Sequence, residues 1–187
     1  RKLNLKDDQK KIAKSFQLLT SKPVVYICNV EEDNASKGNL YSNAVENRAS
    51  EEQSKCIIIS AAIEAEIAGL EDLSEKTEFL DSLGLKETGL NRVIEAGYNT
   101  LNLIRYYTAG PKESRAWTIK NGMTAKEAAG VIHSDFSRGF ICAETISFEH
   151  YISLGGEQAA KEAGKMRQEG RDYIVQDRDI LLFRFNI

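Results

Sequence analysis

The chain has 187 residues, of which 42% are hydrophobic, enough for one ample domain or two small ones with packed cores. Twenty-five Lys and Arg residues against 28 Asp and Glu residues give a net charge of −3, and no stretch is long and apolar enough to span a bilayer or serve as a signal peptide. The composition argues against a membrane-spanning or secreted protein, and we expect a soluble cytoplasmic one with neither a membrane nor a DNA partner.

Residues 1–20 begin with charged residues and then place Ile12, Phe16 and Leu19 at helical spacing. This pattern predicts a helix with one buried stripe that packs on a sheet. The lysines of this segment are expected on its solvated face.

Residues 22–32 carry an unbroken apolar run that is entered at Pro23 and ends at Asn29, Glu31 and Glu32. Such a run predicts a parallel strand covered on both faces. A second buried strand is predicted at 56–59, and it ends in the small residues 60–62. Ligands of open parallel sheets bind at the carboxyl ends of the strands, so we expect a site where these two strands end.

Tyr41, Val45 and Ala49 recur four residues apart and predict a helix between the two strands, which makes a right-handed βαβ unit. From 63 to 84 the chain is acidic and helical, and its carboxylates are predicted to be solvated rather than metal ligands. The expected core contacts of this region are Leu70, Leu73, Phe79, Leu80 and Leu83. Thr88 and Gly89 open a last helix, whose apolar pattern continues to Ile104 and closes the first domain.

The second half of the chain changes to short strands and turns, with strands predicted at 105–108 and 115–119. Thr124 and Glu127 match a capping box, so a helix is predicted from there to Ile132. A strand at 139–148, helices at 148–154 and 157–163, and strands at 173–176 and 179–186 complete the expected elements. The last strand alternates apolar and polar residues, which predicts one buried face. These elements suggest a β-grasp domain.

No catalytic or metal site is predicted within the chain. The phosphate-binding sequence Gly-x-x-x-x-Gly-Lys-Ser/Thr does not occur in it. The cysteines Cys28, Cys56 and Cys142 are odd in number and lack metal spacing, so they are expected to be reduced core residues. His133, Asp135 and Arg138 could suggest a general base, but no nucleophile accompanies them, and a helix-end histidine with turn-stabilising groups is the preferred interpretation.

Two short motifs resemble known nucleotide-binding loops. Asn29-x-x-Glu32 and Ser60-Ala61-Ala62 resemble the base-reading loops of P-loop GTPases, normally Asn-Lys-x-Asp and Ser-Ala-Lys. The Glu variant without the Lys resembles the Obg-like ATPase (YchF-type) family. Longer stretches, 107–113, 129–141 and 183–186, carry the same resemblance, which runs from about residue 22 to residue 187.

The resemblance implies an α/β fold: the C-terminal part of a P-loop NTPase parallel-sheet domain over 1–103, with the end of a helical insertion at 1–20, then a small α+β β-grasp (TGS, ubiquitin-like) domain over 104–187. It also implies that the complete protein binds and hydrolyses ATP with Mg²⁺, with a weak GTP preference, whereas no cofactor is certain for this chain alone. The implied base-binding residues are Asn29, Val30, Glu32, Ser60, Ala61 and Ala62. Asn29 is assigned to the purine edge.

The second domain offers a candidate RNA or ribosome surface, which similarity to TGS-containing translation factors also implies. Its basic residues are Lys112, Arg115, Lys120, Arg138, Lys165 and Arg167. Acidic residues are interspersed, so an ordinary mixed-charge surface remains open. Two functions therefore remain: the C-terminal portion of a ribosome- or RNA-associated ATPase, which this chain alone cannot perform, or a non-enzymatic β-grasp module that binds RNA or protein.

Overall fold

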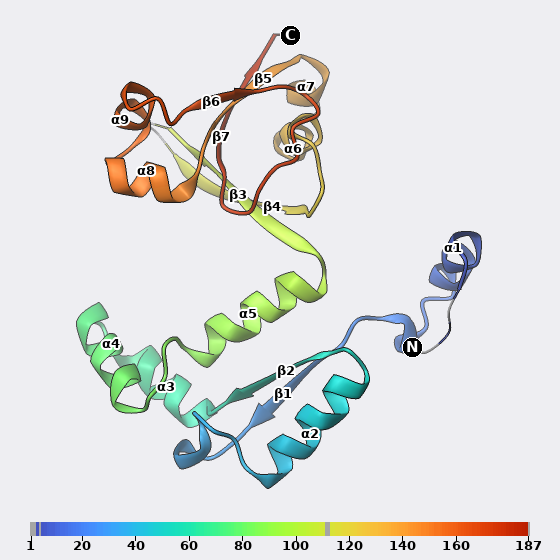
Figure 1. Cartoon of the computed structure of the whole chain (residues 1–187), viewed down its shortest axis with the longest axis vertical. Helices are drawn as coiled ribbons and strands as arrows, with labels where there is room; N and C mark the ends of the chain where they lie inside the picture. The colour runs from blue at the N-terminus through green and yellow to red at the C-terminus, as the bar shows by residue number, and fades with distance from the viewer. Residues whose placement is uncertain (1–2, 4, 111–112, 187) are drawn as a thin grey trace. The chain divides into compact units, whose positions relative to one another are not determined.

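The computed structural model describes residues 3, 5–110 and 113–186, and the chain divides into two compact units. Unit 1 is Arg1–Leu101 and unit 2 is Asn102–Ile187, so the division lies two residues before the predicted one. A two-stranded sheet lies in unit 1 and a five-stranded sheet in unit 2 (Figure 1). No helix in the described part of the chain has the length and apolar character needed to cross a membrane.

The βαβ unit predicted for the first half is present. Strands β1 (Val25–Asn29) and β2 (Lys55–Ile59) pair in parallel, and helix α2 (Leu40–Glu51) connects them. The Asn39 side chain begins α2 by accepting hydrogen bonds from the Tyr41 and Ser42 N–H groups at 3.0 and 2.9 Å. Helices α2 and α5 (Gly89–Thr100) pack on the sheet from opposite sides (Figure 1).

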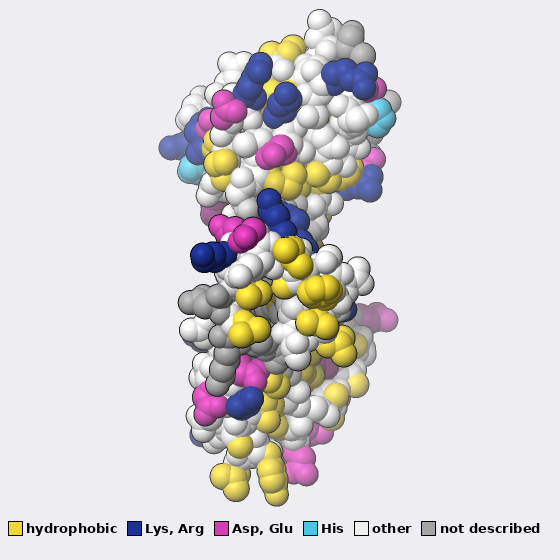
Figure 2. Space-filling model, turned by 90° about the vertical axis from the view of Figure 1, so that its right-hand side faces the viewer, with side chains coloured by type: hydrophobic (Ala, Val, Ile, Leu, Met, Phe, Trp, Pro, Cys, Tyr) yellow, Lys and Arg dark blue, Asp and Glu magenta, His cyan; other side chains and the backbone are white. Residues whose placement is uncertain are grey.

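The burial predicted for the first half is wrong in several places. Ile27 of β1 is 51% exposed, because the sheet has only two strands and β1 has one neighbour. Helix α1 (Asp7–Ser15) forms, but it buries no residue, and Ile12 and Phe16 are 60% and 65% exposed. Hydrophobic side chains therefore reach the surface (Figure 2). Tyr41 of α2 is also exposed, and only Ala49 of its predicted stripe is fully buried.

The helices after β2 form a small core at the carboxyl end of the sheet. Helices α3 (Ala61–Gly69) and α4 (Leu73–Ser82) contribute to it, and its buried members are Ala35, Ile63, Ile67 and Leu85. The predicted contacts Phe79, Leu80 and Leu83 pack against this core. Leu73 does not, because it lies at the exposed start of α4, and α5 ends at Thr100, so that Ile104 belongs to the next strand.

Unit 2 is a mixed sheet crossed by one main helix, the β-grasp arrangement that the sequence suggested. Strand order is β4-β3-β7-β5-β6, with β3 and β7 parallel and the other pairs antiparallel. The strands are β3 (Leu103–Ala109), β4 (Ser114–Lys120), β5 (Phe140–Ile146), β6 (Arg167–Glu169) and β7 (Ile180–Phe185). The helices are α6 (Ala125–Ile132), α7 (Ser134–Arg138), α8 (Phe148–Leu154) and α9 (Glu157–Glu162).

Tyr106 is the centre of the unit 2 core. Its side chain is fully buried, stacks on Trp117 with ring centroids 6.4 Å apart, and meets Phe183 edge-on at 5.9 Å. Its hydroxyl donates to the Ala128 carbonyl of α6 at 2.9 Å, which satisfies the buried polar group. Helix α6 presents three buried alanines to the sheet, so its backbone approaches closely, and the predicted capping box of Thr124 and Glu127 begins it.

The loop before β7 replaces one predicted strand. Residues 173–176 form only a single bridge, between Ile174 and Thr124, because Asp179 holds this segment as a loop. The buried Asp179 carboxylate accepts hydrogen bonds from the Tyr173 hydroxyl at 2.7 Å and the Gln176 N–H at 2.9 Å. Strand β6 was not predicted, because Arg-Gln-Glu carries no hydrophobic alternation.

We expect an Asp179→Asn variant to change the pH dependence of the stability of unit 2. Burial raises the pKa of the Asp179 carboxyl, so its stabilising contribution is complete below the unfolded value of about 3.9 and is lost as pH rises through the folded pKa. Asparagine keeps an acceptor oxygen and does not titrate. Urea unfolding at about pH 4 and pH 7 should show the wild type losing stability relative to the variant at the higher pH. The exposed Asp172→Asn is the control, and a pH-independent difference for Asp179→Asn would contradict the expectation.

Candidate functional site

The two predicted loops meet where β1 and β2 end. Asn29 is the last residue of β1 and pairs with Ile59, the last residue of β2, and Ser60 follows directly. The Val30 N–H donates to the Ile59 carbonyl at 2.9 Å, so the pairing continues one step beyond the strands. This edge is the carboxyl end of the parallel pair, where ligands of open α/β sheets bind.

Asn29 joins the two loops through its side chain. Its Oδ1 accepts a hydrogen bond from the Ala61 N–H at 2.9 Å, which also satisfies the first orphan N–H of helix α3. Because Ala61 needs an acceptor, this bond fixes the orientation of the amide and leaves Nδ2 pointing elsewhere. No acceptor for Nδ2 is found among the described residues. Asn29 therefore offers two free N–H donors beside the loop it holds.

Ser60 is a buried hydroxyl without a partner. It is 3% exposed, and no hydrogen bond to its Oγ exists in the part of the chain that the structure describes. Although Ser60 is the N-cap residue of α3, its side chain does not cap the helix. Buried polar groups are normally satisfied, so this hydroxyl is an exception, and its oxygen is enclosed by protein atoms although Ser60 lines the cavity described next.

A cavity of about 520 Å³ lies over these groups. Five of the six predicted base-loop residues line it, namely Asn29, Val30, Glu32, Ser60 and Ala62. Ala61 takes part through its hydrogen bond to Asn29. Two further residues line the cavity: Glu31, which the sequence places at the end of the first strand but not among the base-binding residues, and Asp33, which no motif indicated. Three of its lining residues carry carboxylates, and none of the described residues that line it is Lys or Arg, so its potential favours the N–H donors of a ligand over acceptors.

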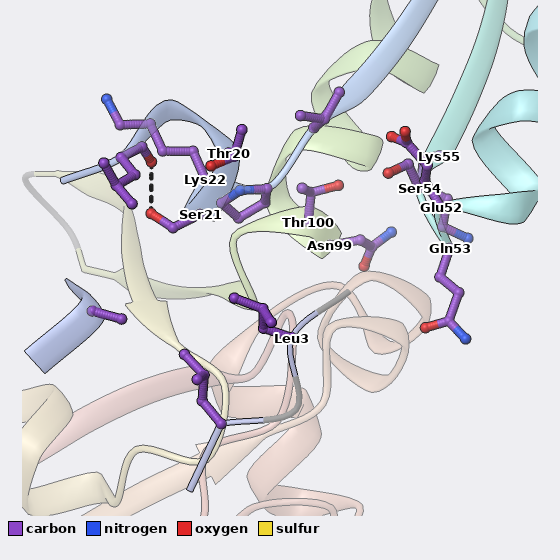
Figure 3. A pocket seen from close by; sticks show the side chains of 15 residues that line it. Leu3, Thr20, Ser21, Lys22, Glu52, Gln53, Ser54, Lys55, Asn99 and Thr100 are labelled. Carbon is purple, nitrogen blue, oxygen red and sulfur yellow. Dashed lines mark hydrogen bonds between the residues drawn. The ribbon is translucent and has the colours of Figure 1, made fainter. Parts of the chain in front are cut away.

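A larger cavity lies at the other end of the strands. It has a volume of about 600 Å³ and is lined around the amino ends of β1 and β2, for example by Lys22, Ser54 and Asn99 (Figure 3). None of the predicted site residues lines it. The amino end of a parallel sheet is also the end where ligands do not usually bind, so we do not place the site there.

The basic residues predicted in unit 2 do not gather into one patch. Arg115 and Lys120 lie on β4, one edge of the sheet, and Arg167 lies on β6, the other edge. Arg115 stacks over Trp117 at 4.2 Å, and Arg167 bonds the Glu169 carboxylate at 3.0 Å. Arg138 ends α7 at 3.6 Å from Asp135, Lys165 precedes β6, and Lys112 lies outside the described residues.

Other groups with potential chemistry have structural explanations. His133 Nδ1 accepts the Asp135 N–H at 3.3 Å and so begins α7. Cys28 and Cys56 approach to 3.7 Å between their sulfur atoms but sit diagonally across the strands, which is poor geometry for a disulfide, and burial raises the pKa of Cys56 to about 11. Within residues 3, 5–110 and 113–186, no three His, Cys, Asp or Glu side chains are placed to hold a metal ion.

Comparison with known proteins gives consistent matches along the chain. Residues 103–186 match the family YchF-GTPase_C, described as a protein of unknown function (DUF933). All of the chain aligns with the "Ribosome-binding ATPase YchF" of Escherichia coli O157:H7 at 54% identity over 187 residues. The protein of the same name from Bacillus subtilis (strain 168) is 48% identical over 189 residues. The chain covers 51% of each relative, so it spans about half the length of the curated relatives it matches.

Solved structures agree with these matches. The Schizosaccharomyces pombe YchF GTPase superposes with a TM-score of 0.81 at 33% identity, covering 98% of this chain and 49% of that one. A GTP-binding protein from Pyrococcus horikoshii OT3 superposes with a TM-score of 0.59 at 22% identity, covering 88% and 46%. At that identity the second likeness supports the fold alone.

Proposed function

The chain belongs to the YchF family, and from that premise we propose that unit 1 supplies the purine-binding side of an ATP site. The observation that carries the proposal is that Asn29, whose Nδ2 has no partner among the described residues, lines one cavity together with four other residues of the two loops. The named relatives are described as ribosome-binding ATPases, and they are about twice as long as this chain.

Asn29 is suited to recognise a purine rather than one particular purine. Its Nδ2 can donate to N7, an acceptor present on both adenine and guanine. Selectivity is assigned to Glu32, which stands where GTPase loops have the shorter aspartate that accepts the N1 and N2 donors of guanine. The longer side chain should spoil that bidentate contact, and it can accept the N6 amino donor of adenine instead. Val30 replaces the usual lysine of GTPase loops and lacks the long aliphatic stem that would cover the base. These features support ATP, with GTP binding more weakly.

The phosphate and magnesium side of the site is assigned to the part of the relatives that this chain does not span. The described residues hold no group of ligands that suits a magnesium ion, and the sequence has no phosphate-binding loop. Mg²⁺ bound to ATP would neutralise charge on the phosphates during transfer. The residues of this chain bind and orient the base.

Binding of a fluorescent ATP analogue tests the proposal directly. The 187-residue chain should bind it weakly, and AMP should compete whereas ribose phosphate, which lacks the base, should not. The contrast isolates the base pocket, because the two competitors differ only in the purine. Equal competition by both compounds, or no binding at millimolar concentration, would count against a base site.

We expect no ATP hydrolysis by the chain alone. Phosphoryl transfer depends on groups that position the phosphates and the metal, and the sequence lacks the loop that does so. A steady-state phosphate-release assay should give the rate of the buffer blank. Turnover that persists through repurification would overturn this expectation.

For unit 2 we propose contact with the ribosome through RNA, in the cytoplasm. Basic residues at the two edges of the sheet support it, Arg115 and Lys120 on β4 and Lys165 and Arg167 at or next to β6. Filter binding to ribosomes at two salt concentrations should show salt-dependent retention. Replacing the two basic residues of one edge by glutamine, and then those of the other edge, shows which edge the retention depends on. A non-enzymatic protein-binding module is the alternative, and retention that neither salt nor the glutamine pairs change would favour it.

A further inference from the structure

Glu64 of α3 makes an unusual connection to the last helix of unit 1. Its carboxylate accepts two backbone hydrogen bonds from the start of α5, from the Gly89 N–H at 2.6 Å and the Leu90 N–H at 3.1 Å. Thr88 Oγ1 accepts the third N–H, that of Asn91, at 3.1 Å. The three orphan donors at the start of α5 are thus satisfied, two of them by a residue 25 positions earlier in the chain.

The start of α5 lies close to β2 and to Glu64 because residue 89 is a glycine. A Cβ at this residue would lie 2.7 Å from Ile59 Cγ2 and 2.8 Å from Glu64 Oε1, so glycine lets the start of α5 approach both β2 and Glu64. The charge of Glu64 also complements the positive end of the α5 dipole. Charge-assisted bonds of this kind are stronger than neutral ones.

Glu64 lies one helical turn from the candidate base loop. Its own N–H donates to the Ser60 carbonyl at 3.0 Å, and Ala61, in the same turn, donates to Asn29 Oδ1. A short series of bonds therefore runs from α5 through Glu64 to Ser60 and Asn29. The start of α3 is held from both sides, by β1 and by α5.

We propose that Glu64 is a positioning residue for the base pocket, which keeps Ser60–Ala62 in place by bonding the first turn of α3 to α5. This assignment rests on the proposed base-binding function. By linkage, a ligand that binds the ordered loop also stabilises the bond to α5, so nucleotide binding slows exchange of the Gly89 and Leu90 amides. The sequence pattern placed Glu64 among solvated carboxylates, and only the structure shows its contacts.

The test compares two variants that each weaken the cap of α5. Glu64→Gln removes the charge and leaves one acceptor oxygen for two donors, whereas Thr88→Ala removes the third cap bond without touching α3. NMR titration of the isotope-labelled chain with AMP should show about tenfold weaker binding for Glu64→Gln and a change below about twofold for Thr88→Ala. Amide exchange of Gly89 and Leu90 should slow on AMP addition in the wild type.

The outcomes separate this proposal from the proposed function. If the wild type binds ribose phosphate as tightly as AMP, the proposal of a base site is itself wrong. If it prefers AMP but Glu64→Gln binds AMP as the wild type does, the positioning role is wrong. Equal weakening by both variants shows that α5 stability alone matters, which also overturns the role. Weaker AMP binding in Glu64→Gln but not in Thr88→Ala, with unchanged amide spectra away from the site, supports the positioning role.

Discussion

A Gly139→Ala variant should lose the stable fold of unit 2 while unit 1 is unaffected. A Cβ at Gly139 would clash with the Asn186 carbonyl oxygen and lie 2.8 Å from its carbonyl carbon. The clash is with backbone, which no rotamer change relieves. The same two residues are joined by a hydrogen bond from the Asn186 N–H to the Gly139 carbonyl at 2.9 Å, where β7 leaves the sheet beside β5. Relief of the clash therefore breaks this pairing.

We expect the change to destabilise unit 2 by about 3 kcal/mol or more, at the upper end for overpacking. For a unit of this size, each kcal/mol lowers the melting temperature by roughly 4–8 °C. Circular dichroism should show the loss in one of two thermal transitions. Gly170→Ala is the matched control, because nothing lies within 4 Å of a Cβ there. If Gly139→Ala had the same melting temperature as the control, the end of β7 would be able to move away from residue 139 without loss of stability, and the expectation would be wrong.

Local sequence signals predicted much of unit 2 correctly. The Thr124 capping box placed the start of α6, and α8 has the predicted bounds of 148–154. The apolar and polar alternation of the last strand predicted the buried face of β7, where Leu181 and Phe183 are buried and Arg184 is exposed. These elements are defined by neighbours a few residues apart, so their patterns survive without knowledge of the rest of the fold.

Several predictions that depended on distant partners were wrong. The apolar stripes of α1 and α5 indicate surfaces suited to packing, but a stripe does not show what covers it, and Phe16 and Leu101 are exposed in the described chain. The three residues of β6 are held by pairing with β5, not by their own propensity. Helix α7 was missed because it is a single turn begun by the His133 side chain.

The candidate site shows the same division. The ends of two parallel strands predicted which loops meet, and the structure brings them together at one cavity. The sequence could not show that Asn29 Oδ1 accepts a hydrogen bond from the Ala61 N–H, or that Ser60 Oγ is buried without a partner among the described residues. Nor could it show that the Glu64 carboxylate accepts hydrogen bonds from the start of α5. Each of these facts depends on residues that lie 25 or more positions apart, or on burial that they create together.

An Asn29→Asp variant should lose purine binding and keep the loop intact. Aspartate retains an oxygen that accepts the Ala61 N–H, but it replaces the Nδ2 donor with a second acceptor that repels purine N7. Loss of the bond and the added repulsion should amount to about 2–3 kcal/mol, or roughly 30- to 150-fold weaker AMP binding. Titration of the labelled chain with AMP measures it.

Asn29→Ala separates the two roles of the side chain. It removes both the donor for the base and the acceptor for Ala61, so exchange of the Ala61 amide should become faster as well as AMP binding weaker. In Asn29→Asp the Ala61 amide should exchange at the wild-type rate. Because the aspartate variant keeps an acceptor for the Ala61 N–H and removes the Nδ2 donor, unchanged AMP affinity in it would place the purine contact elsewhere. Loss of affinity with a protected Ala61 amide assigns Nδ2 to the base and Oδ1 to the loop.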